Sequence, residues 1–419
     1  MNSPAISLEL NNTGTQLRFL QWRMLLITML CYLFFYTGRQ NYSFAILGIQ
    51  EELNLTASHT GIISGMLLLF YGGGQILSGY LGDRYSPKLI ISMGALASIL
   101  LNHFVSFSTG LWSFLILWCA NGLAQSMGFA PGSKLITNWW PKEERSFAMG
   151  CFLFSSGLSS VVTFGLCLFV IQNYSWPWVF RLPLIPFLCV TIIFYLFISD
   201  RPQEYGYQVA SENTNKENSS SKQNSILMII SNKKFVLASL AMGFCSIARY
   251  GLIIWVPVYY LKAASDHNVW ITLALPFGMA IGSIVAGYLT DKYFAENKNH
   301  VISIFMIMAA GLIVVFLKVP NELVTLNILI LFVCGFFVYG AQTPLFSICH
   351  DLIDKHNLST AMGLMNATGY AFAGMGEFII GYMIYKNNNN FKLMFIVVLI
   401  SCVLSALMAI GANNDTKCK

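Results

Sequence analysis

The sequence predicts an all-α membrane protein whose twelve transmembrane helices form two pseudo-symmetric bundles of six. The composition is the first reason for this prediction. Of the 419 residues, 56% are hydrophobic and only 10% are charged, and the mean hydropathy is +0.63. A soluble globular protein carries about 25% charged residues, so this chain has too few to cover a surface that faces water.

Recurrent apolar runs are the second reason. Each run is roughly 18 to 25 residues long, which is enough for a helix to cross the bilayer core of about 30 Å. The predicted spans begin near residues 23, 60, 88, 110, 147, 177, 235, 270, 300, 324, 358 and 391.

A polar segment separates these spans into two sets of six. Residues 200–234 are rich in Asn, Ser, Lys and Glu, as in SENTNKENSSSKQNS, which is typical of a flexible linker. The predicted order is a cytoplasmic tail, a bundle, a cytoplasmic linker, a second bundle and a cytoplasmic tail, over residues 1–22, 23–199, 200–234, 235–412 and 413–419.

A repeated motif is the third reason. GYLGDRYSPK at Gly79–Lys88 follows the second predicted span, and GYLTDKYF at Gly287–Phe294 follows the eighth. An aspartate can cap a helix terminus and pair with the base that follows it, while glycine lets helices approach closely. We therefore expect a conformational latch at the cytoplasmic helix ends, formed by Asp83, Arg84, Asp291 and Lys292.

Two arginines lie inside predicted spans, at matching places in the two halves. Nearly the same number of residues separates Arg39 from Arg249 as separates the two motif aspartates. A cation inside a span costs roughly 2.5 to 3.5 kcal/mol on insertion scales, so such residues mark polar cavities and substrate pathways. The pair predicts one anion site built by both halves. The alternative is a structural cation, for which Glu377 of the eleventh span is an available partner.

Glu377 is the only carboxylate well inside a predicted span. It is a candidate proton-coupling group or a counter-charge to an arginine. The alternative is an acid near the end of its helix, close to the outer water.

The net charge of +6 does not indicate nucleic-acid binding, because its distribution has another explanation. If the N-terminus is cytoplasmic, the basic residues gather in cytoplasmic segments, as the positive-inside rule requires. We expect the first apolar run to be a retained span and not a cleavable signal. We expect a multi-pass protein of a bacterial inner membrane with both termini in the cytoplasm and the lipid bilayer as its surroundings.

Enzyme chemistry is not indicated. The sequence has no nucleophile–base arrangement, no phosphate-binding loop and no Cys/His cluster with metal-ligand spacing, and its ten cysteines are scattered. We expect a transporter, not an enzyme, that acts as a monomer and needs neither a cofactor nor a metal.

Three segments resemble the organophosphate:inorganic-phosphate antiporter family, which has the major facilitator fold. They are NGLAQSMGFAPGSKLITNWWPKEER (Asn121–Arg145), CGFFVYG (Cys334–Gly340) and NATGYAFAG (Asn366–Gly374). YTGRQNYSFAI around Arg39 and ARYGLIIWVPVYYL around Arg249 resemble its first and seventh helices. The resemblance covers nearly the whole chain except the linker and the tails.

The resemblance implies that Arg39 and Arg249 bind the substrate phosphate. A guanidinium suits this role because it is planar, always charged and bidentate toward phosphate oxygens. Tyr71, Tyr339 and Tyr370 match tyrosines of the family's pocket.

The chain departs from the glycerol-phosphate member of that family at four places. Gln40 and Gln75 stand where that member has lysines, Ser156 stands at a histidine, and Ser246 stands at a tyrosine. The predicted site is therefore less cationic. Gln40 and Gln75 are candidates for reading a substrate hydroxyl or for bonding neighbouring helices.

The leading functional prediction is secondary transport of a small organic anion by alternating access, with a phosphorylated metabolite exchanged for inorganic phosphate. Two alternatives remain open. One is a proton-coupled symporter of a carboxylate or another small nutrient, with Glu377 as the proton carrier. The other is a membrane sensor that binds a sugar phosphate.

Overall fold

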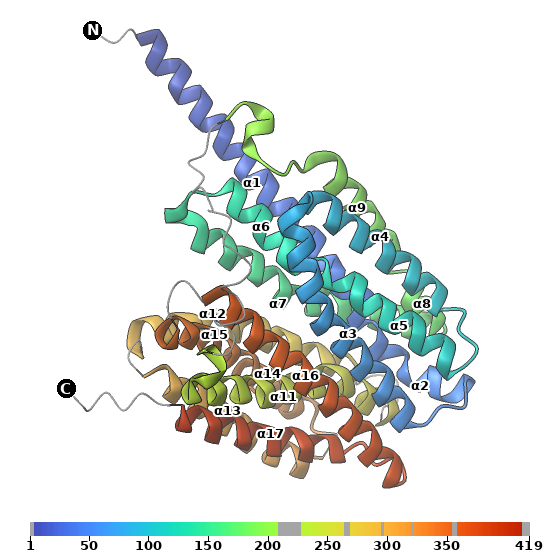
Figure 1. The fold of residues 1–419 in the computed structure, drawn as a ribbon. Coiled ribbons are helices and arrows are strands. Elements are labelled where there is room, and N and C mark those ends of the chain that lie inside the picture. Colours follow the sequence, from blue (N-terminus) through green and yellow to red (C-terminus); the bar gives the residue numbers. More distant parts are fainter. Residues whose placement is uncertain are drawn as a thin grey trace, which may run out of the picture.

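The computed structural model describes residues 4–207, 228–263, 269–294, 297–320, 322–353 and 358–412. Within these residues the protein is helical and contains no strand, so the predicted all-α class is confirmed. Figure 1 shows the helices of the first half at the upper right and those of the second half at the lower left.

The first half of the described chain runs along the length of its bundle six times. Three of these passes are made by two helices in succession: α1 with α2, α5 with α6, and α8 with α9. The helices are α1 (Pro4–Gln40), α2 (Tyr42–Glu52), α3 (Ala57–Arg84), α4 (Pro87–Val105), α5 (Leu111–Ser126), α6 (Phe129–Trp139), α7 (Lys142–Asn173), α8 (Pro177–Arg181) and α9 (Leu184–Phe197).

The second half repeats this plan in the residues that the structure describes. Here α14 and α15 together make one pass, and the short η2 leads directly into α12. The elements are η1 (Pro202–Tyr205), which precedes the bundle, then α11 (Lys233–Ala263), η2 (Val269–Leu273), α12 (Ala274–Tyr293), α13 (Lys298–Lys318), α14 (Val324–Gly340), α15 (Gln342–Leu352), α16 (Leu358–Lys386) and α17 (Leu393–Gly411).

Equivalent breaks support the internal repeat. The pass made by α5 and α6 breaks just before Phe129, and the pass made by α14 and α15 breaks just before Gln342. In each case the third residue of the second helix is a proline, Pro131 or Pro344. Proline has no backbone N–H, so it fits the first turn of a helix and not the interior. The same residue type thus restarts a helix at the same place in both halves.

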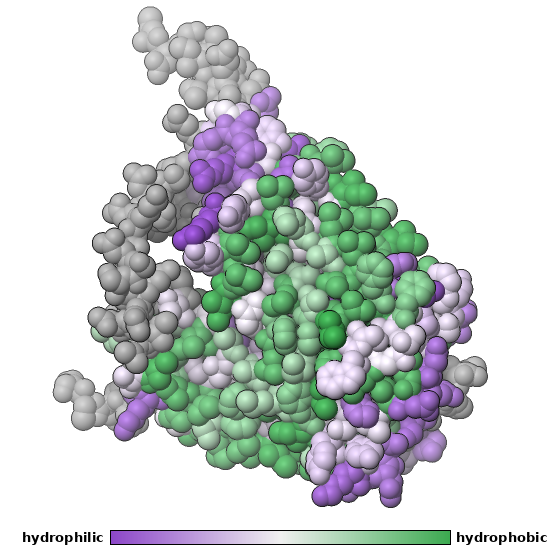
Figure 2. Space-filling model, turned by 45° about the vertical axis from the view of Figure 1, so that its right-hand side comes forward, coloured by the Kyte–Doolittle hydropathy of each residue, from purple (hydrophilic) through white to green (hydrophobic). Residues whose placement is uncertain are grey.

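Ten segments of the described chain are long and apolar enough to cross a membrane. The predicted spans near residues 110 and 358 are helical but are not among the ten. The first is interrupted after Ser126, and the second, α16, carries polar residues such as Asn366 and Glu377 along its length. Figure 2 shows apolar side chains over the middle of one face, with polar side chains gathered at its two ends. This pattern fits a multi-pass membrane protein.

The two halves pack against each other along α3 and α16, which run antiparallel. Their backbones approach closely near Gly61 and Gly381: a Cβ added at Gly61 would lie 2.6 Å from the carbonyl oxygen of Glu377 and 2.9 Å from the Cα of Gly381. Glycine at such positions permits close helix contact within a membrane. We call this α3–α16 contact the seam.

The predicted domain division at residues 23–199 and 235–412 remains a prediction. Helix α1 already begins at Pro4 and α11 at Lys233, a little before the predicted bundle limits. Residues 208–227 of the predicted linker and the predicted tail at 413–419 lie outside the described residues. Tyr205 of η1 accepts a hydrogen bond of 2.9 Å from Nη2 of Arg23, which ties the end of the first half to α1.

Candidate functional site: two arginines joined by tyrosines

Arg39 lies at the end of α1, where its side chain is only 7% exposed. Its guanidinium carbon lies 4.0 Å from the ring centre of Tyr36 and 4.4 Å from that of Tyr71. Tyr36 is three residues earlier on the same helix face, and Tyr71 comes from α3. The buried Nη1 atom has no hydrogen-bond partner among the described residues, so Arg39 retains a donor for an incoming anion.

A buried amide network fixes the backbone next to Arg39. The carbonyl of Gly38 accepts hydrogen bonds of 2.9 Å from Nδ2 of Asn102 and 2.8 Å from Nδ2 of Asn121. Asn41, at the break between α1 and α2, donates to Oδ1 of Asn102 at 3.0 Å. These three asparagines are fully buried. Because buried amides cost free energy when unpaired, this network holds the helix break in one geometry.

A side chain at position 38 would require its neighbours to shift. A Cβ there would lie 2.7 Å from Nε2 of Gln125 and 2.9 Å from Oγ of Ser98. These two atoms are already hydrogen-bonded to each other at 2.7 Å. The packing of α1 against α4 and α5 at this point therefore depends on a missing side chain.

Arg249 lies in the middle of α11 and is 6% exposed. Its guanidinium carbon lies 4.3 Å from the ring centre of Tyr339 and 5.0 Å from that of Tyr250. Its Nη1 donates a hydrogen bond of 2.9 Å to Oε1 of Gln342, the first residue of α15. Arg249 thus has aromatic neighbours like those of Arg39, and in addition a side-chain acceptor.

Tyrosines connect the two arginines across the seam. The rings of Tyr71 and Tyr370 lie 4.6 Å apart, and those of Tyr370 and Tyr250 lie 5.8 Å apart. The cations therefore converge from opposite bundles on one cluster of phenols. Two guanidinium groups and several hydroxyl donors are chemically suited to hold an anion that carries two charges.

The structure brings together five of the residues singled out from the sequence: Arg39, Arg249, Tyr71, Tyr339 and Tyr370. The sequence reasoning missed Tyr36, Tyr250 and Gln342. Spacing could have found Tyr36, because it lies one helical turn from Arg39, and adjacency could have suggested Tyr250. Gln342 belongs to a distant span, and nothing in the sequence marks it.

Gln40 does not join the arginine cluster. Its Nε2 donates to Oγ of Ser160 on α7 at 3.0 Å, and its buried Oε1 has no hydrogen-bond partner among the described residues. Consecutive residues of a helix point in different directions, so a neighbour in sequence need not share a site. The structure supports the alternative that Gln40 bonds a neighbouring helix.

Gln75 lies on the seam, one turn beyond Tyr71. Its Oε1 accepts a hydrogen bond of 2.6 Å from Nδ2 of Asn366 on α16, one turn before Tyr370. The contact joins the two halves next to the tyrosine pair. Gln75 therefore remains a candidate substrate-binding residue, and Asn366 becomes a second candidate.

The two serines at the departures from the family pattern occupy the same region. The hydroxyl of Ser156 on α7 lies 3.2 Å from that of Tyr339 on α14, a contact between the halves. Ser246 packs beside Gly369, where a Cβ would lie 2.9 Å from its Oγ. Ser156 thus contacts a pocket tyrosine, and Ser246 lies beside the residue that precedes Tyr370.

Glu377 is 1% exposed, so its carboxyl group is enclosed by protein. Its Oε2 accepts hydrogen bonds of 3.0 Å from Ser64 on α3 and 2.7 Å from Nε1 of Trp255 on α11. Among the described residues it forms no ion pair with either arginine, and its buried Oε1 has no hydrogen-bond partner. Glu377 thus joins the halves at a second point of the seam, two turns from Tyr370.

The predicted latch is only partly described, because the side chains of Asp83 and Asp291 lie outside the described residues. The two bases behave alike. The guanidinium carbon of Arg84 lies 4.1 Å from the ring centre of Tyr80, and Nζ of Lys292 donates to the hydroxyl of Tyr288 at 2.6 Å. Each base thus contacts a tyrosine one turn earlier, and the latch itself stays a prediction.

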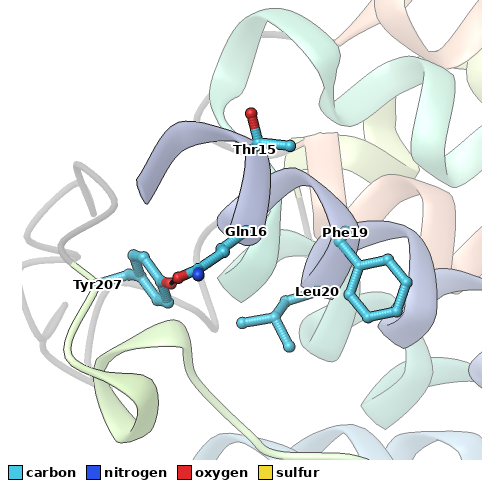
Figure 3. A pocket seen from close by; sticks show the side chains of 5 residues that line it. All are labelled: Thr15, Gln16, Phe19, Leu20 and Tyr207. Carbon is cyan, nitrogen blue, oxygen red and sulfur yellow. Dashed lines mark hydrogen bonds between the residues drawn. The ribbon is translucent and has the colours of Figure 1, made fainter. Parts of the chain in front are cut away.

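One surface pocket lies far from the arginines, beside the first turns of α1. Figure 3 shows its lining, where the hydroxyl of Tyr207 donates to Oε1 of Gln16 at 3.0 Å. The lining consists of Thr15, Gln16, Phe19, Leu20 and Tyr207. None of these residues is charged, so we assign no anion to this pocket. No group of His, Cys, Asp and Glu among the described residues is placed to hold a metal ion.

Comparison with known proteins gives a family. The profile described as Major Facilitator Superfamily matches residues 28–376. Among curated proteins, the chain is 25% identical to the glycerol-3-phosphate transporter of Bacillus subtilis, over 91% of this chain and 90% of that protein. It is 26% identical to the phosphoglycerate transporter protein of Salmonella typhimurium, over 86% and 82%.

A third relative has a different described role. The chain is 24% identical to the membrane sensor protein UhpC of Escherichia coli, over 95% of this chain and 93% of that protein. Among solved structures, a bacterial homologue of the lysosomal transporter Spinster superposes with a TM-score of 0.75 at 16% identity, covering 93% of this chain and 96% of that one. The resemblance drawn from the sequence and the predicted fold are both confirmed.

Proposed function

Because the chain belongs to the Major Facilitator Superfamily, we propose that it is a secondary transporter that exchanges a phosphorylated metabolite for inorganic phosphate. One observation carries this proposal: Arg39 and Arg249 converge from opposite bundles on one tyrosine cluster. The relatives named for glycerol-3-phosphate and phosphoglycerate transport support the substrate class.

The proposed mechanism follows from electrostatics. Two buried cations that share a cluster repel each other, and a bound phosphate removes that repulsion. The bundles then close around the anion and open on the other side of the membrane. An empty site keeps two uncompensated charges, so it crosses less readily. This gives a physical reason for obligatory exchange, in which each outward passage of one anion is followed by the inward passage of another.

The membrane and the orientation belong to the same proposal. The three relatives named above are bacterial, and the charge distribution favours cytoplasmic termini. We therefore propose a bacterial inner membrane and a monomer that works alone.

Phosphate exchange in liposomes tests the proposal. Purified protein is reconstituted with unlabelled phosphate inside, uptake of labelled phosphate is followed, and glycerol-3-phosphate and glucose-6-phosphate are added as competitors. We expect saturable uptake that internal phosphate stimulates. Arg39→Lys and Arg249→Lys should each reduce it by about a hundredfold, because lysine lacks the bidentate fork that holds phosphate. Near-normal uptake in either variant contradicts the proposal.

Glu377 favours a second candidate function, proton-coupled symport. A buried carboxylate that links both bundles is suited to carry a proton between them. In that case an acidic exterior drives uptake without internal phosphate, and Glu377→Gln abolishes this drive. The similarity to a membrane sensor is a third possibility, which binding of a sugar phosphate without any transport would support.

A further inference from the structure

We propose that the transported phosphate esters carry hydroxyl groups but no second anionic group, and that Gln75 and Asn366 determine this specificity. The inference rests on the proposed function, because it concerns the organic part of the same substrate. It goes further by stating which esters the site accepts and which side chains select them.

The charge of the site sets the first limit. The groups described as contacting the two guanidiniums are tyrosine rings and the amide of Gln342, with no carboxylate and no further lysine or arginine among them. A phosphate monoester carries about −1.5 to −2 charges at pH 7. Its phosphate group alone therefore matches the two arginines. A further negative charge on the ester would need a cation elsewhere.

On the side of the seam toward Gly82, the side chains that follow the tyrosine pair are amides, and no lysine or arginine among the described residues bonds to them. One turn from the Tyr71–Tyr370 pair lie Gln75 and Asn366, which are both partly exposed. Their mutual hydrogen bond uses Oε1 of Gln75 and Nδ2 of Asn366. No hydrogen bond is formed within the described residues by the other amide atoms. The pair can thus present one donor and one acceptor, which suits a neutral hydroxyl.

A lysine that contacts α3 further along is held by a backbone carbonyl. Nζ of Lys134 on α6 donates to the carbonyl of Gly82 at 2.5 Å, close to the C-terminus of α3. Gly82 lies two helical turns beyond Gln75. Lys134 therefore stabilises the end of α3, away from the tyrosine pair.

The other direction along the seam is unfavourable to an anion as well. Two turns outward from Tyr370 lies Glu377, with Ser64 and Trp255 as its partners. A carboxyl group offers no positive charge in either protonation state, and when ionised it repels a second anion. An ester with a carboxylate thus finds compensation on neither side of the phosphate.

Two matched ligands test the inference. Glycerol-3-phosphate and 3-phosphoglycerate have the same carbon chain and phosphate, but the second has a carboxylate where the first has a hydroxymethyl group. Competition against labelled phosphate exchange is measured with the wild-type protein. We expect 3-phosphoglycerate to compete at least about tenfold more weakly, since an uncompensated charge costs more than 1.4 kcal/mol.

A charge-changing variant tests the assigned residue. Gln75→Lys places a cation one turn from the tyrosine pair and should narrow the gap between the two ligands by about tenfold. The matched control Gln75→Met removes the amide without adding charge. This variant should weaken competition by glycerol-3-phosphate without strengthening competition by 3-phosphoglycerate. Asn366→Ala should resemble the control.

The outcomes separate this inference from the proposed function. Equal competition by the two ligands in the wild-type protein overturns the inference but leaves phosphate exchange standing. If Gln75→Lys leaves the difference in competition between the two ligands unchanged, the role assigned to Gln75 is overturned. Absence of phosphate exchange in protein that is folded, as judged by its melting curve, overturns the proposed function and the inference with it.

Discussion

Arg39 and Arg249 occupy matching places in the two bundles, yet different parts of the protein hold them. The backbone beside Arg39 is fixed by buried asparagines at a helix break, while its guanidinium has a free donor. Arg249 lies within an unbroken helix, and its guanidinium is held by Gln342. One cation is positioned through its main chain and the other through its side chain.

This difference has a consequence for substrate binding. Both guanidiniums keep a buried donor without a partner among the described residues, Nη1 of Arg39 and Nε of Arg249. Arg249 also has a fixed acceptor in Gln342, so it should lose less freedom than Arg39 when the anion arrives. We therefore expect Arg249 to be pre-positioned and Arg39 to be ordered by the contact with phosphate. The contributions of Arg39 and Arg249 can be separated by removing the support of each arginine in turn.

The largest effect is expected from the main-chain support of Arg39. Gly38→Ala would push a methyl group into Gln125 and Ser98, so the buried network must shift. We expect a loss of about 2 kcal/mol or more in the free energy of unfolding and severely reduced exchange. Thermal melting in detergent and uptake assays measure both quantities.

Gly73→Ala is the matched control for this substitution. Gly73 lies in α3, and a Cβ there would have no neighbour within 4 Å. Alanine is favoured over glycine inside a helix by roughly 0.5–1 kcal/mol, so stability should be unchanged or slightly higher. A similar loss in both variants would mean that the network does not set the stability of this bundle.

An intermediate effect is expected from the side-chain support of Arg249. Gln342→Met keeps the size of the residue but removes the acceptor of Arg249 Nη1. Hydrogen bonds to charged groups contribute about 1.5–3 kcal/mol, so the apparent affinity for phosphate should fall by about tenfold or more. Binding isotherms on purified protein measure this change. An affinity within twofold of wild type would show that Gln342 does not hold Arg249.

The smallest effect is expected at the residue next to Arg39. Gln40→Met is the same chemical change as Gln342→Met, but Gln40 bonds Ser160 on α7 and not an arginine. We expect the affinity for phosphate to stay within about fivefold of wild type, because the lost bond is a neutral one worth about 1 kcal/mol. If Gln40→Met lost more affinity for phosphate than Gln342→Met, the side-chain support of Arg249 would not be the more important of the two contacts.

The sequence predicted the fold well because its signals are local. Apolar runs mark the spans, and the repeated Gly79–Lys88 and Gly287–Phe294 motifs mark the two halves. The span near residue 358 is less apolar than expected for a physical reason. In α16, Asn366 and Glu377 are polar because they bond across the seam, and not because the helix lies outside the bundle.

The sequence predicted those site residues whose burial in a membrane span costs free energy. Arg39 and Arg249 stand out because a cation inside a membrane span is costly and usually marks a functional site. Their supports could not be predicted in the same way. Asn102, Asn121 and Gln342 belong to other spans, and a buried amide looks alike in a sequence whether it fixes a helix break or binds a substrate. Glu377 was suggested as a partner for an arginine, but its hydrogen bonds go to Ser64 and Trp255.

The central claim is that both arginines hold a single anion, and a double-variant cycle tests it most directly. Phosphate exchange is measured in liposomes for wild type, Arg39→Lys, Arg249→Lys and the double variant. A shared site predicts strong coupling, so the double variant should lose no more than about threefold beyond either single variant. Losses that multiply, with each single variant retaining substantial exchange, would show that the two arginines act at separate places and would contradict the claim.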